Sequence, residues 1–533
     1  MSGSSLSASL EALEAALQEG ERSAIAAAVR LLREYESLPL EALPLLERLF
    51  SRPRLSGWMR RQAVGMLLRI EPIPPRLLSL LLEASDDEEE GWSQEIAQTI
   101  LKRKIATFSS LASILENPSS SLQALRMGVR LIGEASSAAR LDFASAFGFS
   151  GQPVLCALFK LLSHPDLRLS RITAWAISVW PLPLPKEGVP ALTAALAHLD
   201  PQVACFAAGA LASFESLPAS ASSPVFAALS YPYFAIRGYA ALCLAKLSEA
   251  PKEDAIPLLL GMMRQTEAWE RRCALEALGR VVSHQMELIH RLAEPLSDPD
   301  DDVCITAAEA LRRLTYRAIV VLPALLEALQ HPSWRRRRVL YHVIGQIGPS
   351  AYEATPALLR GLKEDRWRVR RVAAQALATL RPTAEQAEAA LLAAFRDSHW
   401  EIREAIAEAL SYLQNPSSDV IDSLLAAFHD PRLPVRSASA RALGWLPTHA
   451  AQTVPALASA LSSTDPAFRL AVVESLHRLG SLAAPATLAL QACLAAETSP
   501  HLRSLVKQTL LLFEDPSTSS SFSTRPPPHS DPL

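Results

Sequence analysis

The stretch DRWRVRRVAAQAL, residues 365–377, decides the fold of this chain. Its central arginine belongs to a column that recurs at one constant interval, at Arg337, Arg370, Arg403, Arg436 and Arg469. A column of tryptophans precedes it by three residues, at Trp334, Trp367 and Trp400. The period of about 33 residues lies in the range that is typical of stacked-repeat architectures. It therefore predicts a chain built from many copies of one small unit.

The unit itself is a pair of helices, read most clearly over residues 354–380. Pro356 begins a short apolar helix, because proline suits a first turn whose amide has no helical partner. Residues 363–365 form a polar turn, and a second helix runs from Arg366 to about Leu380. Its apolar residues fall on one stripe at helical spacing. Neither helix can bury its stripe alone, so the pairs are expected to stack on their neighbours.

This pattern of proline, apolar helix, turn aspartate, Val-Arg and Ala-x-x-Ala-Leu resembles the HEAT-repeat family. The resemblance covers residues 153–513 well and 20–133 loosely, and it recurs in DPRLPVR, residues 430–436. It implies an all-α, right-handed α-solenoid of about fifteen antiparallel helix pairs. It also implies that second helices line the concave side and that turn aspartates and the arginine column form a hydrogen-bonded ladder. The residues assigned to that ladder are Asp365, Arg370, Arg403, Asp430, Arg436 and Arg469.

Interruptions of the period predict the domain organisation. We expect a disordered N-terminus over residues 1–9, degenerate helical repeats over 10–137, and regular repeats over 153–513. The segment 138–152 is an irregular insertion with three phenylalanines, which is either a helix that fills a packing gap or an aromatic docking element. Residues 514–533 are rich in Ser and Pro and are expected to be disordered.

Composition excludes several classes of protein. The 533 residues carry a formal charge of −3, which disfavours nucleic acid as the general partner. Six scattered cysteines form no Cys-x-x-Cys pair, so no zinc ribbon or redox dithiol is predicted and a reducing compartment is expected. The N-terminus lacks a signal-peptide pattern, and no uninterrupted apolar run reaches membrane-spanning length. These features predict a cytoplasmic protein without a membrane span.

Catalytic signatures are absent from the sequence. It contains no His-Glu-x-x-His, no Gly-x-Ser-x-Gly, no phosphate-binding glycine loop and no Gly-x-Gly-x-x-Gly. We therefore predict a protein that is not an enzyme, with no metal site and no cofactor.

A basic cluster is the strongest electrostatic feature. Helical phasing places Arg335 and Arg338, and one repeat later Arg368 and Arg371, opposite the apolar stripe of their second helices. Acidic residues precede and follow them in the neighbouring repeats. Two interpretations stay open: ion pairs between repeats, Arg335 with Asp302, Arg368 with Glu401 and Arg371 with Glu404, or a basic strip that binds an acidic or phosphorylated segment. The tryptophan column indicates packing against the next turn, with cation–π or base stacking as the alternative.

The sequence thus favours a scaffold that binds protein partners, with an acidic or extended segment, along its second helices. The residues assigned to that surface are Arg335, Arg338, His342, Arg368, Arg371, Tyr412, Arg441 and Trp445. The alternatives are an accessory or lyase-like factor that holds a cofactor or client, and a nucleic-acid binder. Partner identity, pathway and oligomeric state are not specified by these residues.

Overall fold

The computed structural model describes residues 3–35, 37–50, 57–71, 77–84, 108–138, 152–181, 183–247, 252–281, 286–413 and 416–514. Two compact units divide the chain, Met1–Leu259 and Leu260–Leu533. The division falls inside α16 (Lys252–Met262) and not at the predicted insertion 138–152, of which residues 139–151 lie outside the described part. Residues 515–533 of the predicted tail also lie outside it.

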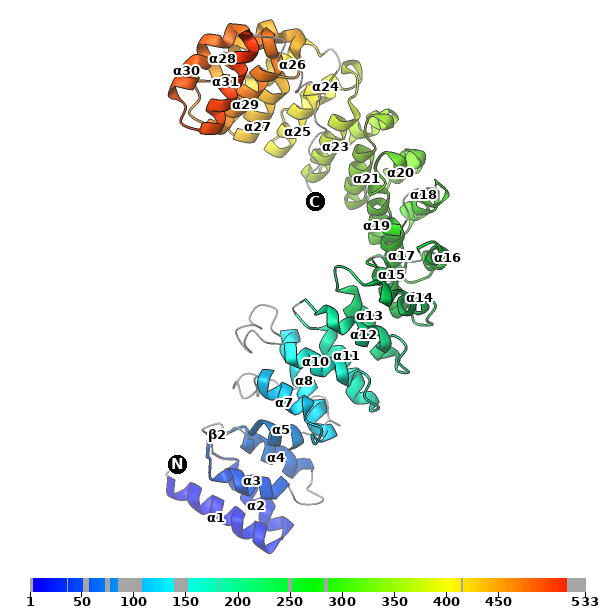
Figure 1. Ribbon diagram of the computed structural model, residues 1–533, viewed down its shortest axis with the longest axis vertical. Coiled ribbons are helices and arrows are strands. Elements are labelled where there is room, and N and C mark those ends of the chain that lie inside the picture. Colours follow the sequence, from blue (N-terminus) through cyan, green and yellow to red (C-terminus); the bar gives the residue numbers. More distant parts are fainter. Residues whose placement is uncertain are drawn as a thin grey trace. The chain divides into compact units, whose positions relative to one another are not determined.

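The first unit is almost entirely helical (Figure 1). Its strands are two residues long and pair in parallel, Leu38 with Ile70 and Pro39 with Glu71. The elements are α1 (Gly3–Glu19), α2 (Arg22–Leu32), β1 (Leu38–Pro39), α3 (Ala42–Phe50), α4 (Gly57–Leu67), β2 (Ile70–Glu71), α5 (Leu77–Ala84), α7 (Phe108–Glu116), α8 (Leu122–Ala138), α10 (Gln152–Leu161), α11 (Leu167–Ser178), η1 (Lys186–Gly188), α12 (Val189–Ala195), α13 (Pro201–Ala212), η2 (Ala219–Ala221), α14 (Ser222–Ala228) and α15 (Phe234–Leu244).

The second unit repeats one helix pair with a short 3₁₀ turn between many of its pairs. Its elements are α17 (Ala268–Val281), α18 (Met286–Ala293), η3 (Glu294–Ser297), α19 (Asp301–Arg312), η4 (Thr315–Val321), α20 (Leu322–Ala328), α21 (Trp334–Ile347), η5 (Gly348–Ala354), α22 (Thr355–Gly361), α23 (Trp367–Leu380), α24 (Ala384–Ala394), α25 (Trp400–Ser411), α26 (Ser418–Ala426), η6 (Ala427–His429), α27 (Leu433–Leu443), η7 (Pro447–His449), α28 (Ala450–Ala460), α29 (Pro466–Leu479), η8 (Gly480–Ala486), α30 (Thr487–Ala496) and α31 (Pro500–Glu514).

The pair α22 and α23 shows why the sequence folds this way. Proline lies in the first turn of α22, and the five residues 362–366, four of them charged, separate the two helices. The predicted apolar stripe of α23 is buried, including Val369, Leu377 and Leu380. Burying each such side chain contributes about 1.5–3 kcal/mol. The two helices pack on each other, and α23 packs on α21 and α25, so each pair completes its core with its neighbours, as predicted.

Small residues allow neighbouring second helices to approach closely. A Cβ atom at Gly444, directly after α27, would lie 2.7 Å from the Cα of Ser475 in α29, and one at Gly279 in α17 would lie 2.6 Å from the Cβ of Ala310 in α19. The two glycines occupy the same place in repeats that lie five periods apart. The 33-residue period therefore places a close contact between neighbouring second helices as well as the column of arginines.

Several second helices are followed by a residue with a positive φ. Gly348 and Gly480 have φ of +78° and +60°, which glycine adopts without strain. Arg381 takes the equivalent place after α23 with φ +53°. The sequence analysis did not predict this role for an arginine, because the left-handed region is rare outside glycine and asparagine.

The all-α fold is confirmed, whereas the N-terminus differs from expectation. Residues 1–9 were expected to be disordered, but α1 begins at Gly3. The apolar residues that continue through this helix, Leu13, Ala16 and Leu17, are buried, and this packing stabilises the helix.

Candidate binding surface

The arginine column joins each turn to the next. In Arg370, Nη1 donates to the carbonyls of Glu364 and Asp365 in its own turn, at 2.7 and 2.9 Å. Its Nε and Nη2 donate to the carboxylate of Asp397 in the following turn, at 2.7 and 3.2 Å. The same two-sided contact recurs along the second unit in Arg271–Asp298, Arg337–Glu364, Arg403–Asp430, Arg436–Asp465 and Arg469–Glu497.

The acceptor carboxylates also hold the start of the next second helix. Asp397 accepts from the amide of His399 at 2.9 Å, and Asp430 accepts from the amide of Arg432 at 2.9 Å. Burial alone would raise the pKa of both carboxyl groups. The hydrogen bonds from Arg370 to Asp397 and from Arg403 to Asp430, together with these amides and the guanidinium charges, outweigh burial and hold each pKa below 3.8.

Most predicted ladder residues lie in this ladder, but one does not. Arg370, Arg403, Asp430, Arg436 and Arg469 are all members, although the Arg436–Asp465 contact is longer, at 3.5 Å. Asp365 contributes only its backbone carbonyl, and Glu364 is the carboxylate that pairs with Arg337, at 2.5 Å. The prediction for the Asp365 side chain was wrong, because Glu364, and not Asp365, lies 33 residues before Asp397 and in register with Asp430.

The predicted binding residues on α21 lie at different depths. Arg335 is exposed and pairs with Asp302 of α19 at 3.0 Å, as one of the two interpretations expected. Arg338 is half-buried, and its Nε has no hydrogen-bond partner among the described residues. His342 is half-buried one turn later, and burial followed by the charges of Arg312 and Arg338 lowers its pKa below 6.5.

One repeat further, the basic residues of α23 lie beside the tryptophan column. Arg368 is exposed and its guanidinium carbon lies 5.1 Å from the ring centroid of Trp367. It forms no ion pair with Glu401, although both residues belong to the described part, so that expected pair is absent. Arg371 is half-buried. Trp367 stacks on His399 of the next turn with a centroid distance of 5.4 Å, which is the packing role predicted for this column.

The three remaining predicted residues lie at the ends of α25 and α27. Tyr412 was predicted to be exposed but is only 7% exposed, because it ends α25 packed under Arg381, whose guanidinium lies 5.3 Å from its ring. Arg441 and Trp445 are half-buried, and Arg478 from α29 covers the ring of Trp445 at 5.1 Å. The residues named from the sequence therefore follow neighbouring second helices, and Arg335 and Arg368 are the more accessible cations among them.

Arg336 has a structural role that sequence reasoning missed. It is 2% exposed, and its Nε donates to Asp301 at 2.5 Å while Nη2 donates to the carbonyl of Pro299 at 3.0 Å. In the sequence, a run of four arginines suggests a single exposed cluster. Successive residues of a helix are rotated by about 100°, so the four side chains point in different directions and one of them points into the adjoining turn. This rotation is the signal that could have identified Arg336.

The described residues offer little for catalysis. They include no group of three or more His, Cys, Asp or Glu side chains that could hold a metal ion. Burial raises the pKa of the thiols of Cys243 and Cys273 to about 12 and that of Cys304 to about 11, which makes these thiols poor nucleophiles.

One apolar segment has the length and composition of a membrane span. It covers Pro466–Ala496, and only 28% of its most apolar window is buried. It is not one continuous α-helix, since η8 separates α29 from α30 and Gly480 there has a positive φ. We expect such apolar content in helices that pack on two neighbours.

Comparison with known proteins gives one family assignment. The model of HEAT repeats matches residues 189–281, 287–378, 355–444 and 421–510, which together make up more than half of the chain. Among curated proteins, none matches the sequence.

Solved structures with a similar backbone are distant in sequence. A crystal structure of an engineered protein has a TM-score of 0.40 and 18% identity, covering 76% of this chain and 98% of its own. A Kap95:Nup1 complex has a TM-score of 0.48 and 13% identity, with 95% and 77% covered. Importin beta has a TM-score of 0.46 and 12% identity, with 95% and 84% covered. The helix pairs, the ladder and the matched family model together show that the chain belongs to the HEAT-repeat proteins.

Proposed function

We propose that this chain is a non-enzymatic scaffold that binds an acidic, extended segment of a protein partner across α21 and α23. The observation that supports the proposal is the pair Arg335 and Arg368. Both are exposed and occupy the same position in consecutive second helices, one period apart, and the exposed ion pair of Arg335 with Asp302, a kind that contributes only about 0–1 kcal/mol, can be replaced by a carboxylate of the ligand. Guanidinium groups bind carboxylates in a bidentate geometry that combines energy with specificity.

The spacing of the second helices favours an extended ligand. Packed helices lie about 8–10 Å apart, and an extended polyproline II segment has three residues per turn with a rise of about 3.1 Å per residue. Carboxylates three residues apart on such a segment lie on one side of it, about 9 Å apart, and therefore match the separation of the two arginines. Acidic residues on α19 and α25, Asp302 and Glu401 among them, border the basic strip and oppose displacement of the segment along it.

The proposal is tested with a defined acidic peptide. A fluorescein-labelled peptide with glutamate at every third position is titrated with the full chain and followed by fluorescence anisotropy. Arg335→Glu combined with Arg368→Glu is expected to weaken binding at least tenfold, whereas the matched first-helix change Arg360→Glu is expected to change it less than twofold. Unaltered affinity in the double variant, with an unchanged unfolding midpoint, contradicts the proposal.

A salt titration separates this function from nucleic-acid binding. The peptide complex is expected to weaken moderately between low and physiological salt, and an oligonucleotide of equal length is expected to bind more weakly than the peptide at both. Tighter binding of the oligonucleotide with a steep salt slope would favour a phosphate-binding function instead. The cytoplasmic location stays a prediction.

A further inference from the structure

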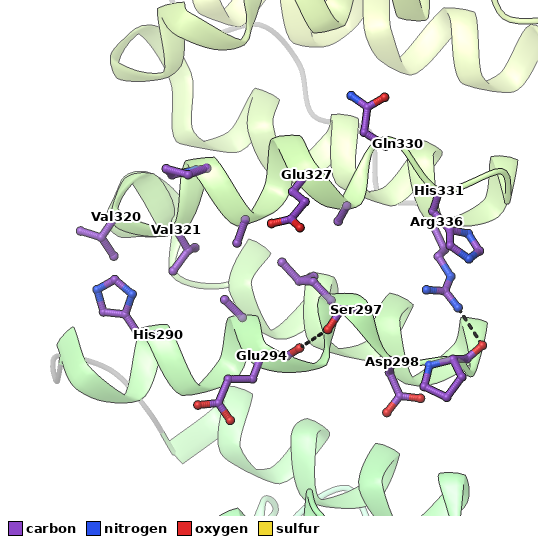
Figure 2. Close-up of a pocket in the computed structure, with 16 residues that line it drawn as sticks. His290, Glu294, Ser297, Asp298, Val320, Val321, Glu327, Gln330, His331 and Arg336 are labelled. Carbon is purple, nitrogen blue, oxygen red and sulfur yellow. Dashed lines mark hydrogen bonds between the residues drawn. The ribbon is translucent and has the colours of Figure 1, made fainter.

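A groove in the second unit lies between first helices and away from the basic strip. It has a volume of about 860 Å³ and is lined by α18 and η3 on one side and by η4 and α20 on the other. Figure 2 shows Glu294 and Ser297 on one wall and Val320, Val321 and Glu327 on the other. A volume of this order accommodates a short stretch of side chains.

Small residues open the groove. Ala293 ends α18 on one wall, and Ala324 and Ala328 face the space from α20 on the other. First helices of these two repeats contact each other mainly through their 3₁₀ extensions, α18 with η4 and α20 with η3. The stretch between these contacts is left without the close side-chain packing that protein interiors normally have.

The floor of the groove is apolar. Leu296 and Val321 lie beneath it and are each only 3% exposed, so the apolar surface that a ligand can reach belongs to half-buried Val320, Ala324 and Ala328. An apolar side chain placed there would be removed from water, with a gain of about 25 cal/mol for each Å² of apolar surface covered.

The ionic groups at one end of the groove are already engaged. Arg336 pairs with Asp301 and with the carbonyl of Pro299. Asp298 pairs with Arg271 in the ladder, at 2.8 Å. These two lining charges are therefore neutralised by structural partners and do not set the charge of the groove.

The charges left at the rim are acidic. Glu327 is exposed on α20, and in Figure 2 its carboxylate points toward the opposite wall. Glu294 is half-exposed on that wall and forms an ion pair with Arg291, with a nitrogen–oxygen distance of 2.7 Å. His290 and His331 lie at its two ends. The groove thus combines an apolar floor with an acidic rim.

We propose that this groove is a second docking site, which binds a basic amphipathic segment of a partner protein. An apolar side chain of the segment rests on Val320 and Ala324, and a lysine or arginine beside it pairs with Glu327. The site lies on first helices and carries the opposite charge from the strip at Arg335 and Arg368. One chain can therefore bind two partners of opposite charge, and this site does not depend on the function proposed above.

A pair of peptides tests the charge and the floor separately. The probe is a labelled nine-residue peptide, KLLKKLLKG, and its counterpart with glutamate in place of every lysine. Because the glutamate peptide can itself bind the basic strip, both peptides are titrated against the full chain carrying Arg335→Gln and Arg368→Gln, which is expected to bind the lysine peptide at least tenfold more tightly than the glutamate peptide by fluorescence anisotropy. Glu327→Lys removes the acidic rim and Ala324→Trp fills the groove, and each is expected to weaken the lysine peptide at least tenfold.

Two control variants make the result specific. Glu385→Lys reverses an exposed acidic charge on the first helix α24 and is expected to change the affinity less than twofold. Arg368→Glu is expected to weaken only the acidic peptide of the previous section. The inference is overturned if the lysine peptide binds equally to wild type, Glu327→Lys and Ala324→Trp with all three folded by circular dichroism. It is also overturned if wild type dimerises by light scattering and Ala324→Trp is monomeric, because the occupant is then a second copy of the chain.

Discussion

Removing one carboxylate from the ladder is expected to weaken the stack locally and measurably. Asp430→Ala deletes the acceptor of Arg403 Nε and Nη2, at 2.7 and 3.0 Å, and of the Arg432 amide at 2.9 Å. The side chains of Arg403 and Asp430 are 15% and 10% exposed. Breaking a buried pair typically costs about 3–5 kcal/mol, and the residual solvent contact places this pair near the lower end, about 3 kcal/mol.

A double-mutant cycle isolates the pairwise contribution. Arg403→Ala, Asp430→Ala and the double variant are unfolded in urea at neutral pH and followed by far-UV circular dichroism. The coupling free energy is expected to lie between about 1 and 3 kcal/mol. Because each repeat contacts only its neighbours, the single variants are also expected to broaden or split the unfolding transition.

The exposed pair Arg335 and Asp302 provides the matched control. Its oxygen–nitrogen distance is 3.0 Å, but its side chains are 54% and 47% exposed. A pair of this kind contributes about 0–1 kcal/mol. Equal coupling energies in the two cycles, or a value below about 0.5 kcal/mol for Arg403 and Asp430, would refute the view that the buried ladder joins the repeats.

Three further outcomes are expected from titration and chemical modification, and a fourth from packing. The ladder carboxylates stabilise the fold fully above pH 3.8, the pKa of an unfolded aspartate, and this stabilisation is lost as the pH falls from 3.8 to the lower pKa of the folded state. Asp397→Asn should therefore make the urea midpoint depend less on pH in acid. The pKa of half-buried His342 is lower in the folded chain than the 6.5 of an unfolded histidine, so stability should fall as the pH drops from 6.5 to that lower pKa. His342→Gln should remove this part of the pH dependence. At mildly alkaline pH, a thiol reagent should modify exposed Cys156 quickly and leave Cys243, Cys273 and Cys304 unreacted until unfolding; rapid reaction of a buried thiol would contradict the structure. Gly444→Leu should lower the unfolding midpoint by an amount equivalent to about 1–3 kcal/mol, because its Cβ meets the backbone of Ser475 at 2.7 Å, and an unchanged midpoint would count against that contact.

The sequence predicted the fold because a fixed period encodes contacts between neighbouring units. In each period the same arginine meets the same kind of turn, so one well-read repeat describes the others. Asp365 was assigned to the ladder as the turn aspartate of its repeat, but the period itself selects Glu364, which lies 33 residues before Asp397. The register is therefore a better guide to the ladder than the type of the residue.

Exposure was harder to predict than position. Tyr412 shares its register with half-buried residues on other second helices but is itself buried under Arg381. That contact depends on the left-handed conformation of Arg381 at the end of α23, which no residue pattern indicates. The groove beside Glu327 was not predicted either. It depends on the distance between two neighbouring first helices, and the spacing of apolar residues along a helix does not determine that distance.

A charge exchange between the protein and its ligand tests the central claim most directly. The acidic peptide and its counterpart with lysine in place of every glutamate are each titrated against wild type and against the Arg335→Glu, Arg368→Glu double variant. The account predicts that wild type prefers the acidic peptide at least tenfold and that the double variant loses or reverses this preference. An unchanged preference for the acidic peptide in a folded double variant would contradict recognition through α21 and α23.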